Sequence, residues 1–201
     1  MSTLIKLCGM FRDVDIAFAN EAMPDFIGFV IDFPKSHRSV APVRAAELKA
    51  LLDPAIKAVG VFVNSDINTC AELANHGIID IIQLHGSENA EYIAALRRLT
   101  KAPIIKAVTV TSPQDIEAAQ ALGADRLLLD NGAGTGRKFN HSLIDGDISD
   151  CFLAGGLTPD NAAEIVRRFH PYAVDMSGGI ETDRVKDKAK MLAAVNAVRS
   201  V

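Results

Sequence analysis

Short apolar segments alternate with longer amphipathic segments along the 201 residues of the chain. The short segments are rich in Val, Ile and Leu and show no regular apolar–polar alternation. Such runs are typical of strands that are buried on both faces of a parallel sheet. They occur at eight places, residues 4–8, 26–31, 56–63, 80–85, 104–108, 126–130, 151–154 and 173–176. The pattern therefore predicts eight parallel strands.

The segments between these strands have the periodicity of helices with one apolar face. Ser65, Ser112 and Thr158 are suitable N-caps, and Gly77 and Gly123 lie where helices are expected to end. Seven helices are predicted, at residues 13–22, 42–52, 67–76, 88–99, 113–122, 159–169 and 184–198.

Alternating strands and helices indicate right-handed strand–helix–strand crossovers. Eight units in 201 residues leave about 25 residues for each, close to the minimum for one strand and one helix. Two architectures contain such units, the closed (β/α)8 TIM barrel and the open doubly wound sheet. Eight strands favour the barrel. No linker rich in Pro, Gly or Ser divides the chain, so we expect residues 1–201 to form a single α/β domain.

Composition and charge exclude several classes of function. The chain has 21 basic and 25 acidic residues, and the net charge of −4 gives no general attraction to nucleic acid or to an anionic membrane. No apolar run is long enough to cross a membrane, and no secretory signal is recognisable at the N-terminus. Three widely spaced cysteines predict no disulfide framework. We expect a cytoplasmic protein that binds neither nucleic acid nor membranes.

Polar and glycine residues gather at the carboxyl ends of five predicted strands. In a closed barrel these ends meet around one mouth, where the active sites of this fold lie. The residues are Cys8, His85, Asp130, the segment 155–158 and the segment 175–179. The sequence therefore predicts a site at the mouth.

Two glycine-rich segments follow the last two predicted strands, Gly155-Gly156 and Ser177-Gly178-Gly179. Glycine lets backbone N–H groups approach an anion closely, and the N-terminus of a following helix favours negative charge. Tight turns alone are the alternative explanation. Because barrels commonly bind phosphate at these two loops, the pair predicts a phosphate site.

Three side chains are candidates for chemistry at the mouth. Cys8 shares a strand face with Lys6, whose ammonium is expected to lower the pKa of the thiol. Asp130 follows an apolar run, so partial desolvation is expected to raise its pKa and suit it to donate a proton. Arg38, in the loop after the second strand, has the geometry to bind a carboxylate at two points. The alternatives are a buried structural cysteine, a turn-capping aspartate and a solvated loop arginine.

The glycines of residues 131–138 do not complete a dinucleotide-binding motif, because Arg137 stands at the third glycine position. We expect this segment to form a mobile flap over the mouth. The five histidines show no metal-ligand spacing, so no metal site is expected.

A set of short motifs, in this order and over nearly the whole chain, resembles the phosphoribosylanthranilate isomerase family. The motifs are Lys6-Leu7-Cys8-Gly9-Met10, Pro34-Lys35-Ser36-His37-Arg38, Gln83-Leu84-His85-Gly86, Leu129-Asp130, Gly155-Gly156-Leu157 and Asp175-x-Ser177-x-Gly179-x-Glu181. The resemblance implies a (β/α)8 barrel that works without a metal or an organic cofactor. It implies an Amadori rearrangement of N-(5-phosphoribosyl)anthranilate to 1-(2-carboxyphenylamino)-1-deoxyribulose 5-phosphate.

The same resemblance implies a role for each candidate. Cys8 would be the general base that removes the C2 proton, and Asp130 the general acid that protonates the ring oxygen. Arg38 would hold the anthranilate carboxylate. The expected substrate contacts also include Lys6, Gln83, His85, Gly155, Gly156, Asp175, Ser177, Gly178 and Gly179. The expected partner is a small phosphorylated substrate, and the expected assembly is a monomer or a homodimer.

Departures from the family pattern and rival functions accompany this interpretation. Ala154 and Gly178 stand where the family often has serine.

One rival, a pentulose-phosphate epimerase, needs metal ligands at several strand ends. Another, the bifunctional isomerase that also serves histidine synthesis, has an acidic residue where this chain has Cys8. A third, an inactive barrel that only binds, is disfavoured because Cys8 and Asp130 are both present.

Overall fold

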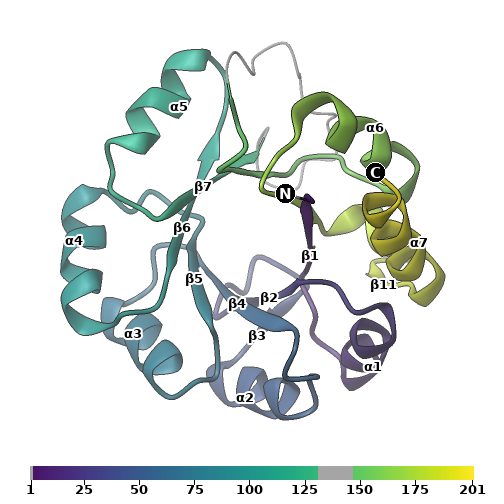
Figure 1. Ribbon diagram of the computed structural model, residues 1–201. Coiled ribbons are helices and arrows are strands. Elements are labelled where there is room, and N and C mark those ends of the chain that lie inside the picture. The colour runs from purple at the N-terminus through teal and green to yellow at the C-terminus, as the bar shows by residue number, and fades with distance from the viewer. Residues whose placement is uncertain (1, 131–146) are drawn as a thin grey trace.

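Strand pairing runs without a break around the computed structural model, which describes residues 2–130 and 147–201 (Figure 1). The strand order is β1-β9-β8-β7-β6-β5-β4-β2, and β1 also pairs with β2, which closes a barrel of eight parallel strands within the described residues. This confirms the predicted (β/α)8 barrel and excludes the open sheet. The strands are β1 (Leu4–Cys8), β2 (Phe26–Ile31), β4 (Lys57–Phe62), β5 (Ile81–Leu84), β6 (Ile104–Thr109), β7 (Arg126–Asp130), β8 (Phe152–Leu153) and β9 (Ala173–Met176).

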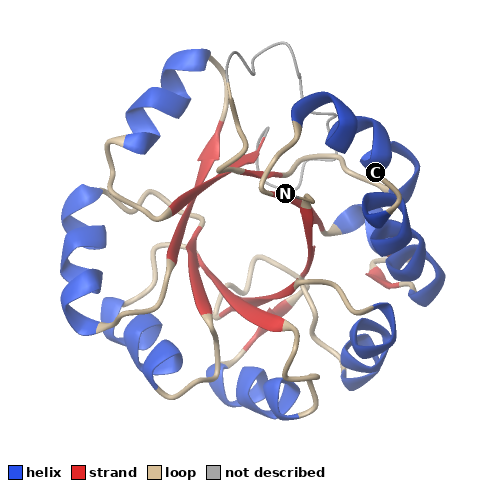
Figure 2. Ribbon diagram, viewed as in Figure 1, coloured by secondary structure: helices blue, strands red, loops and turns tan. Residues whose placement is uncertain are grey.

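Helices form an outer ring around these strands (Figure 2). None of the described helices is long and apolar enough to cross a membrane. As predicted, Gly77 and Gly123 follow helices α3 and α5 with left-handed φ angles of +70° and +80°. The helices are α1 (Asp13–Ala22), α2 (Pro42–Ala50), α3 (Ile67–Asn75), α4 (Ala90–Leu99), α5 (Pro113–Gln120), α6 (Pro159–Phe169) and α7 (Lys188–Arg199).

Two of the three predicted N-caps are confirmed. Ser112 and Thr158 are the N-cap residues of α5 and α6. The third prediction, Ser65, is wrong, because Asp66 caps α3 and its carboxylate accepts hydrogen bonds from the N–H groups of residues 68 and 69. A carboxylate satisfies these unpaired donors as a serine would, and its charge also interacts favourably with the helix dipole.

Strand β3 (Ser39–Val40) and a hairpin before α7 were not predicted. Strand β3 pairs in parallel with β2 beyond the barrel, and it is too short to produce a hydrophobic pattern. The predicted helix 184–198 begins only at Lys188, after Asp187 as N-cap. The residues before it form an antiparallel hairpin of β10 (Glu181–Thr182) and β11 (Val185–Lys186).

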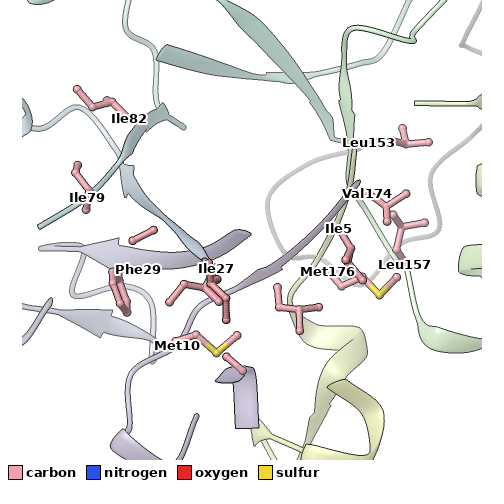
Figure 3. Close-up of a cluster of buried hydrophobic side chains, with 14 of the residues drawn as sticks. Ile5, Met10, Ile27, Phe29, Ile79, Ile82, Leu153, Leu157, Val174 and Met176 are labelled. Carbon is pink, nitrogen blue, oxygen red and sulfur yellow. The ribbon is translucent and has the colours of Figure 1, made fainter. Parts of the chain in front are cut away.

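The strands carry two buried layers, one on each side of the barrel wall. One cluster includes Ile5, Val174 and Met176 of the strands (Figure 3), together with buried residues of helices α6 and α7. The second cluster includes Phe26, Val59, Ile105, Leu128 and Phe152. Because neighbouring residues of a strand face opposite sides, a polar residue next to a helix-facing one points into the barrel. The predicted flap, residues 131–138, lies outside the described residues.

Candidate active site

The structure brings the predicted strand-end residues to one end of the barrel. Cys8 is the last residue of β1, Asp130 the last of β7, and His85 follows β5 directly. All these strands are parallel, so their carboxyl ends surround a single mouth (Figure 1). In the described part of the chain, no three His, Cys, Asp or Glu side chains are close enough to hold a metal ion.

A buried ion pair lies beneath the thiol of Cys8. Lys6 Nζ donates to Asp175 Oδ1 at 3.0 Å, from the neighbouring strand β9. Burial opposes the charge of Lys6, but Asp175 and Cys8 attract it, and together they leave the pKa of Lys6 raised. The Lys6 side chain has no exposed surface. In this structure Lys6 therefore acts on Asp175 and Cys8, and its expected contact with the substrate stays a prediction.

Lys6 lowers the pKa of the Cys8 thiol as expected, but this effect does not decide the net shift, which is upward. Burial of the thiol raises its pKa, and this effect outweighs the attraction of Lys6, while the charge of Asp175 raises the pKa further. The sulfur packs closely against β2, where a Cβ on Gly28 would lie 2.6 Å from Sγ. Burial and the charge of Asp175 therefore favour the thiol of Cys8 over the thiolate.

Asp130 lies beside His85, whose ring also contacts the side-chain amide of Gln83. His85 Nε2 is 3.8 Å from Asp130 Oδ2, and Gln83 Nε2 is 2.9 Å from His85 Nδ1. With the amide nitrogen donating, Nδ1 accepts and the ring proton is on Nε2, on the side of Asp130. Burial lowers the pKa of His85, although Asp130 opposes this effect. Gln83 Oε1 is buried with no hydrogen-bond partner in the described structure.

The two glycine-rich segments contact each other directly. Gly155 and Gly156 have left-handed φ angles of +92° and +68°, which only glycine adopts readily, and α6 begins soon afterwards at Pro159. A Cβ on Gly179 would lie 2.0 Å from the Leu157 carbonyl oxygen. The absence of a side chain at Gly179 therefore lets the two loops meet beside a helix N-terminus, as an anion site requires.

Arg38 reaches the same end of the barrel, but one edge of its guanidinium is already bound. Its Nε donates to Glu181 Oε1 at 2.6 Å and its Nη2 to Glu181 Oε2 at 2.7 Å. The side chain crosses Gly9, where a Cβ would lie 2.4 Å from Arg38 Cδ. Arg38 Nη2 also lies 3.9 Å from the position of a Cβ on Gly178. The structure thus places Arg38 between β1 and the second glycine-rich loop.

Glu181 and Lys186 were not among the predicted site residues. Lys186 Nζ donates to Glu181 Oε1 at 2.6 Å. Burial raises the pKa of Glu181, but the hydrogen bonds from Arg38 and Lys186 dominate and hold it at about 2. Burial lowers the pKa of Lys186, and Glu181 opposes this. Glu181 could have been predicted, because it is the last residue of the motif that begins at Asp175. Lys186 could not, because it falls within the predicted helix 184–198.

Comparisons with known proteins give relatives over nearly the whole chain. Residues 5–197 match a family model described as N-(5'phosphoribosyl)anthranilate (PRA) isomerase. An N-(5'-phosphoribosyl)anthranilate isomerase of Endomicrobium trichonymphae is 40% identical over 202 residues, 98% of each chain. One of Clostridium acetobutylicum is 40% identical over 204 residues, 97% of each chain.

Solved structures agree with these sequence matches. Phosphoribosyl anthranilate isomerase from Thermotoga maritima has a TM-score of 0.86 at 30% identity, covering 99% of this chain and 100% of its own. A phosphoribosyl anthranilate isomerase in complex with reduced 1-(o-carboxyphenylamino)-1-deoxyribulose 5-phosphate has a TM-score of 0.83 at 29% identity, with the same coverage.

Contact between the glycine-rich loops predicts an effect of Gly179→Ala on phosphate binding. The added Cβ collides with backbone, so the loops must separate, and we expect affinity for inorganic phosphate to fall at least about fivefold. Gly123→Ala is the control, because the added Cβ meets nothing within 4 Å among the described residues and Gly123 lies before β7, at the end of the barrel opposite the mouth. Isothermal titration calorimetry measures both. Equal affinities in the two variants would contradict the prediction.

The raised pKa of Cys8 predicts a late titration of its thiol. Thiolate absorbance at 240 nm, taken as the difference between the wild-type protein and Cys8→Ser, should develop only above pH 9, the ordinary thiol value. Cys70 and Cys151, whose burial raises both pKa values to about 11, contribute equally to both proteins and cancel. A midpoint near pH 7 would show that Lys6 outweighs burial.

Proposed function

Since the chain belongs to the N-(5'-phosphoribosyl)anthranilate isomerase family, we propose that Cys8 and Asp130 carry out the proton transfers of its reaction. The chain is an N-(5'-phosphoribosyl)anthranilate isomerase of tryptophan biosynthesis. The product we infer is 1-(2-carboxyphenylamino)-1-deoxyribulose 5-phosphate. The reduced form of this compound bound to a solved relative supports that choice.

The reaction is an internal aldose-to-ketose conversion and needs one acid and one base. Protonation of the furanose ring oxygen opens the ring, and the anilino nitrogen stabilises the resulting cation as a Schiff base. Removal of the C2 proton then gives an enolamine, which tautomerises to the ketone. No atoms are gained or lost.

Asp130 is the proposed acid and Cys8 the proposed base. They end β7 and β1, which are separated around the barrel by β8 and β9, so the two groups can approach a bound sugar from different sides. The base form of Cys8 is the thiolate, and the hydrogen bond and positive charge of Lys6 stabilise it. Asp175 holds Lys6 in place through the ion pair.

The two ends of the substrate are held by different chemistry. The loops containing Gly155, Gly156 and residues 177–179 are proposed to bind phosphate through backbone N–H groups. Arg38 is proposed to bind the anthranilate carboxylate. Gln83 of β5, His85 directly after it and Asp175 of β9 are proposed to contact the sugar. Gln83 Oε1, which has no hydrogen-bond partner in the described structure, is an acceptor for such a contact.

The observation that carries this proposal is the meeting of Cys8, Asp130, Arg38 and both glycine-rich loops at one end of the barrel, from five separate strands. A cytoplasmic location and a monomeric or homodimeric state complete the proposal. Light scattering on the purified protein tests the oligomeric state.

Loss of either catalytic group should nearly abolish turnover. We expect Cys8→Ala and Asp130→Asn each to lower kcat at least about a hundredfold, the usual effect of removing an acid or base. The assay forms the labile substrate in situ and follows the loss of its fluorescence. Cys151→Ala is the control, since it makes the same change at a buried cysteine before β8. A wild-type protein with no rate above background would refute the function itself.

Removal of the Arg38 guanidinium should weaken substrate binding selectively. For Arg38→Ala we expect KM to rise about tenfold, the usual cost of losing a charged hydrogen bond, with affinity for inorganic phosphate retained. Steady-state kinetics and phosphate titration measure the two effects. An unchanged KM would remove Arg38 from the site.

A further inference from the structure

The guanidinium of Arg38 is fixed by a carboxylate to which the proposed reaction gives no role. Glu181 binds the Nε and Nη2 positions at 2.6 and 2.7 Å, a two-point contact that fixes the plane of the guanidinium as well as its position. Among the described residues, Arg38 Nη1 has no hydrogen-bond partner. The remaining edge of the guanidinium is therefore available for a second carboxylate.

A second cation changes the charge balance of this pair. An arginine paired with one glutamate is neutral overall and has little attraction for a further anion. Lys186 also contacts Glu181 Oε1, at 2.6 Å, and its side chain has no exposed surface. Two cations on one carboxylate leave one net positive charge on the cluster of Arg38, Glu181 and Lys186, which suits an anionic group of the substrate.

The hairpin after β9 is what places these groups together. Glu181 of β10 and Lys186 of β11 are directly opposite in its antiparallel register. Opposite charges at such positions stabilise each other across the strands. Lys190 Nζ, from the start of α7, donates to the Glu181 carbonyl oxygen at 2.6 Å and holds the hairpin against that helix. The arrangement is therefore fixed before any ligand arrives.

The same groups are tied to the loop that is proposed to bind phosphate. Lys186 Nζ donates to the Ser177 carbonyl oxygen at 3.1 Å, and Ser177 Oγ donates to the Cys8 carbonyl oxygen at 3.1 Å. A chain of contacts thus runs from Arg38 through Glu181 and Lys186 to the phosphate loop and the end of β1. It fixes the spacing between the two anion-binding ends of the site.

We propose that Glu181 and Lys186 are positioning residues that orient Arg38 toward the aryl carboxylate of the substrate. Through Arg38, they determine selectivity for carboxylate-bearing sugar phosphates over the same compounds without the carboxylate. This inference rests on the proposed role of Arg38, and the experiment below separates the two.

The test uses two reduced product analogues, one with the aryl carboxylate and one with a phenyl group in its place, as competitive inhibitors. For Glu181→Gln we expect Ki of the carboxylate-bearing analogue to rise about tenfold or more, as for loss of a charged hydrogen bond, and Ki of the phenyl analogue to stay within about twofold. Lys186→Met should raise Ki of the carboxylate-bearing analogue by a larger factor than Ki of the phenyl analogue, which it also raises because Lys186 contacts the Ser177 carbonyl of the phosphate loop. In the Arg38→Ala background, Glu181→Gln should add nothing, because Glu181 acts only through Arg38.

The control is Glu47→Gln, which breaks an exposed glutamate–arginine pair, Glu47 with Arg44, outside the mouth. Circular dichroism verifies folding of every variant. Equal losses for both analogues would reduce Glu181 to a general structural support. Tighter binding of the carboxylate-bearing analogue would mean that Glu181 competes with the substrate. Either result overturns the inference, whereas an Arg38→Ala protein that still distinguishes the analogues overturns the proposed role of Arg38 itself.

A rescue experiment keeps the inference testable if Glu181→Gln fails to fold alone. Removal of Arg38 leaves a space next to the Glu181 carboxylate, which free guanidinium ion at low millimolar concentration can enter. We expect guanidinium to restore binding of the carboxylate-bearing analogue to Arg38→Ala, and not to Arg38→Ala with Glu181→Asp, whose shorter side chain withdraws the carboxylate. Restoration in both proteins, or in neither, contradicts a positioning role for Glu181.

Discussion

Closure of the barrel by the pairing of β1 with β2 is the constraint on which the rest of the site depends. This pairing places Cys8 opposite Gly28, and β1 at the same time pairs with β9 through Lys6 and Asp175. The first strand is therefore clamped between the second and the last. Only in a closed barrel do the loops that follow these strands share one mouth, so that Arg38 meets Glu181 from the other end of the chain.

Buried charges next to the mouth are paired in the described structure. Lys6 is paired with Asp175, and Glu181 is paired with both Arg38 and Lys186. Such pairing is a physical necessity, because an isolated charge in a low-dielectric interior is strongly destabilising. It also explains how a chain with a net charge of −4 can present a positive site to an anionic substrate. The local excess of one cation, not the total charge, is what the substrate meets.

The thiol of Cys8 shows how opposing effects decide a chemical property. Lys6 favours the thiolate, but burial and Asp175 favour the thiol, and the sum leaves the pKa raised. The protonated thiol is the less reactive form, so these effects disfavour the thiolate that is the proposed base. The phosphate loops are a contrast, because their proposed binding depends on backbone conformation at Gly155 and Gly156 rather than on a titrating group.

The sequence pattern predicted the eight strands, most of the helices and the polar or glycine residues at the strand ends, and it favoured the closed barrel over the open sheet. These follow from local pattern, because a doubly buried strand must be apolar and a polar strand end must face the mouth. Tertiary structure decided the hairpin before α7, the Arg38–Glu181–Lys186 contacts and the direction of the Cys8 pKa shift. Arg38 and Glu181 are 143 residues apart, and the burial of a thiol depends on what the neighbouring strand carries. Neither the contact between Arg38 and Glu181 nor the burial of the Cys8 thiol produces a periodic pattern in the sequence, so both become visible only in the assembled barrel.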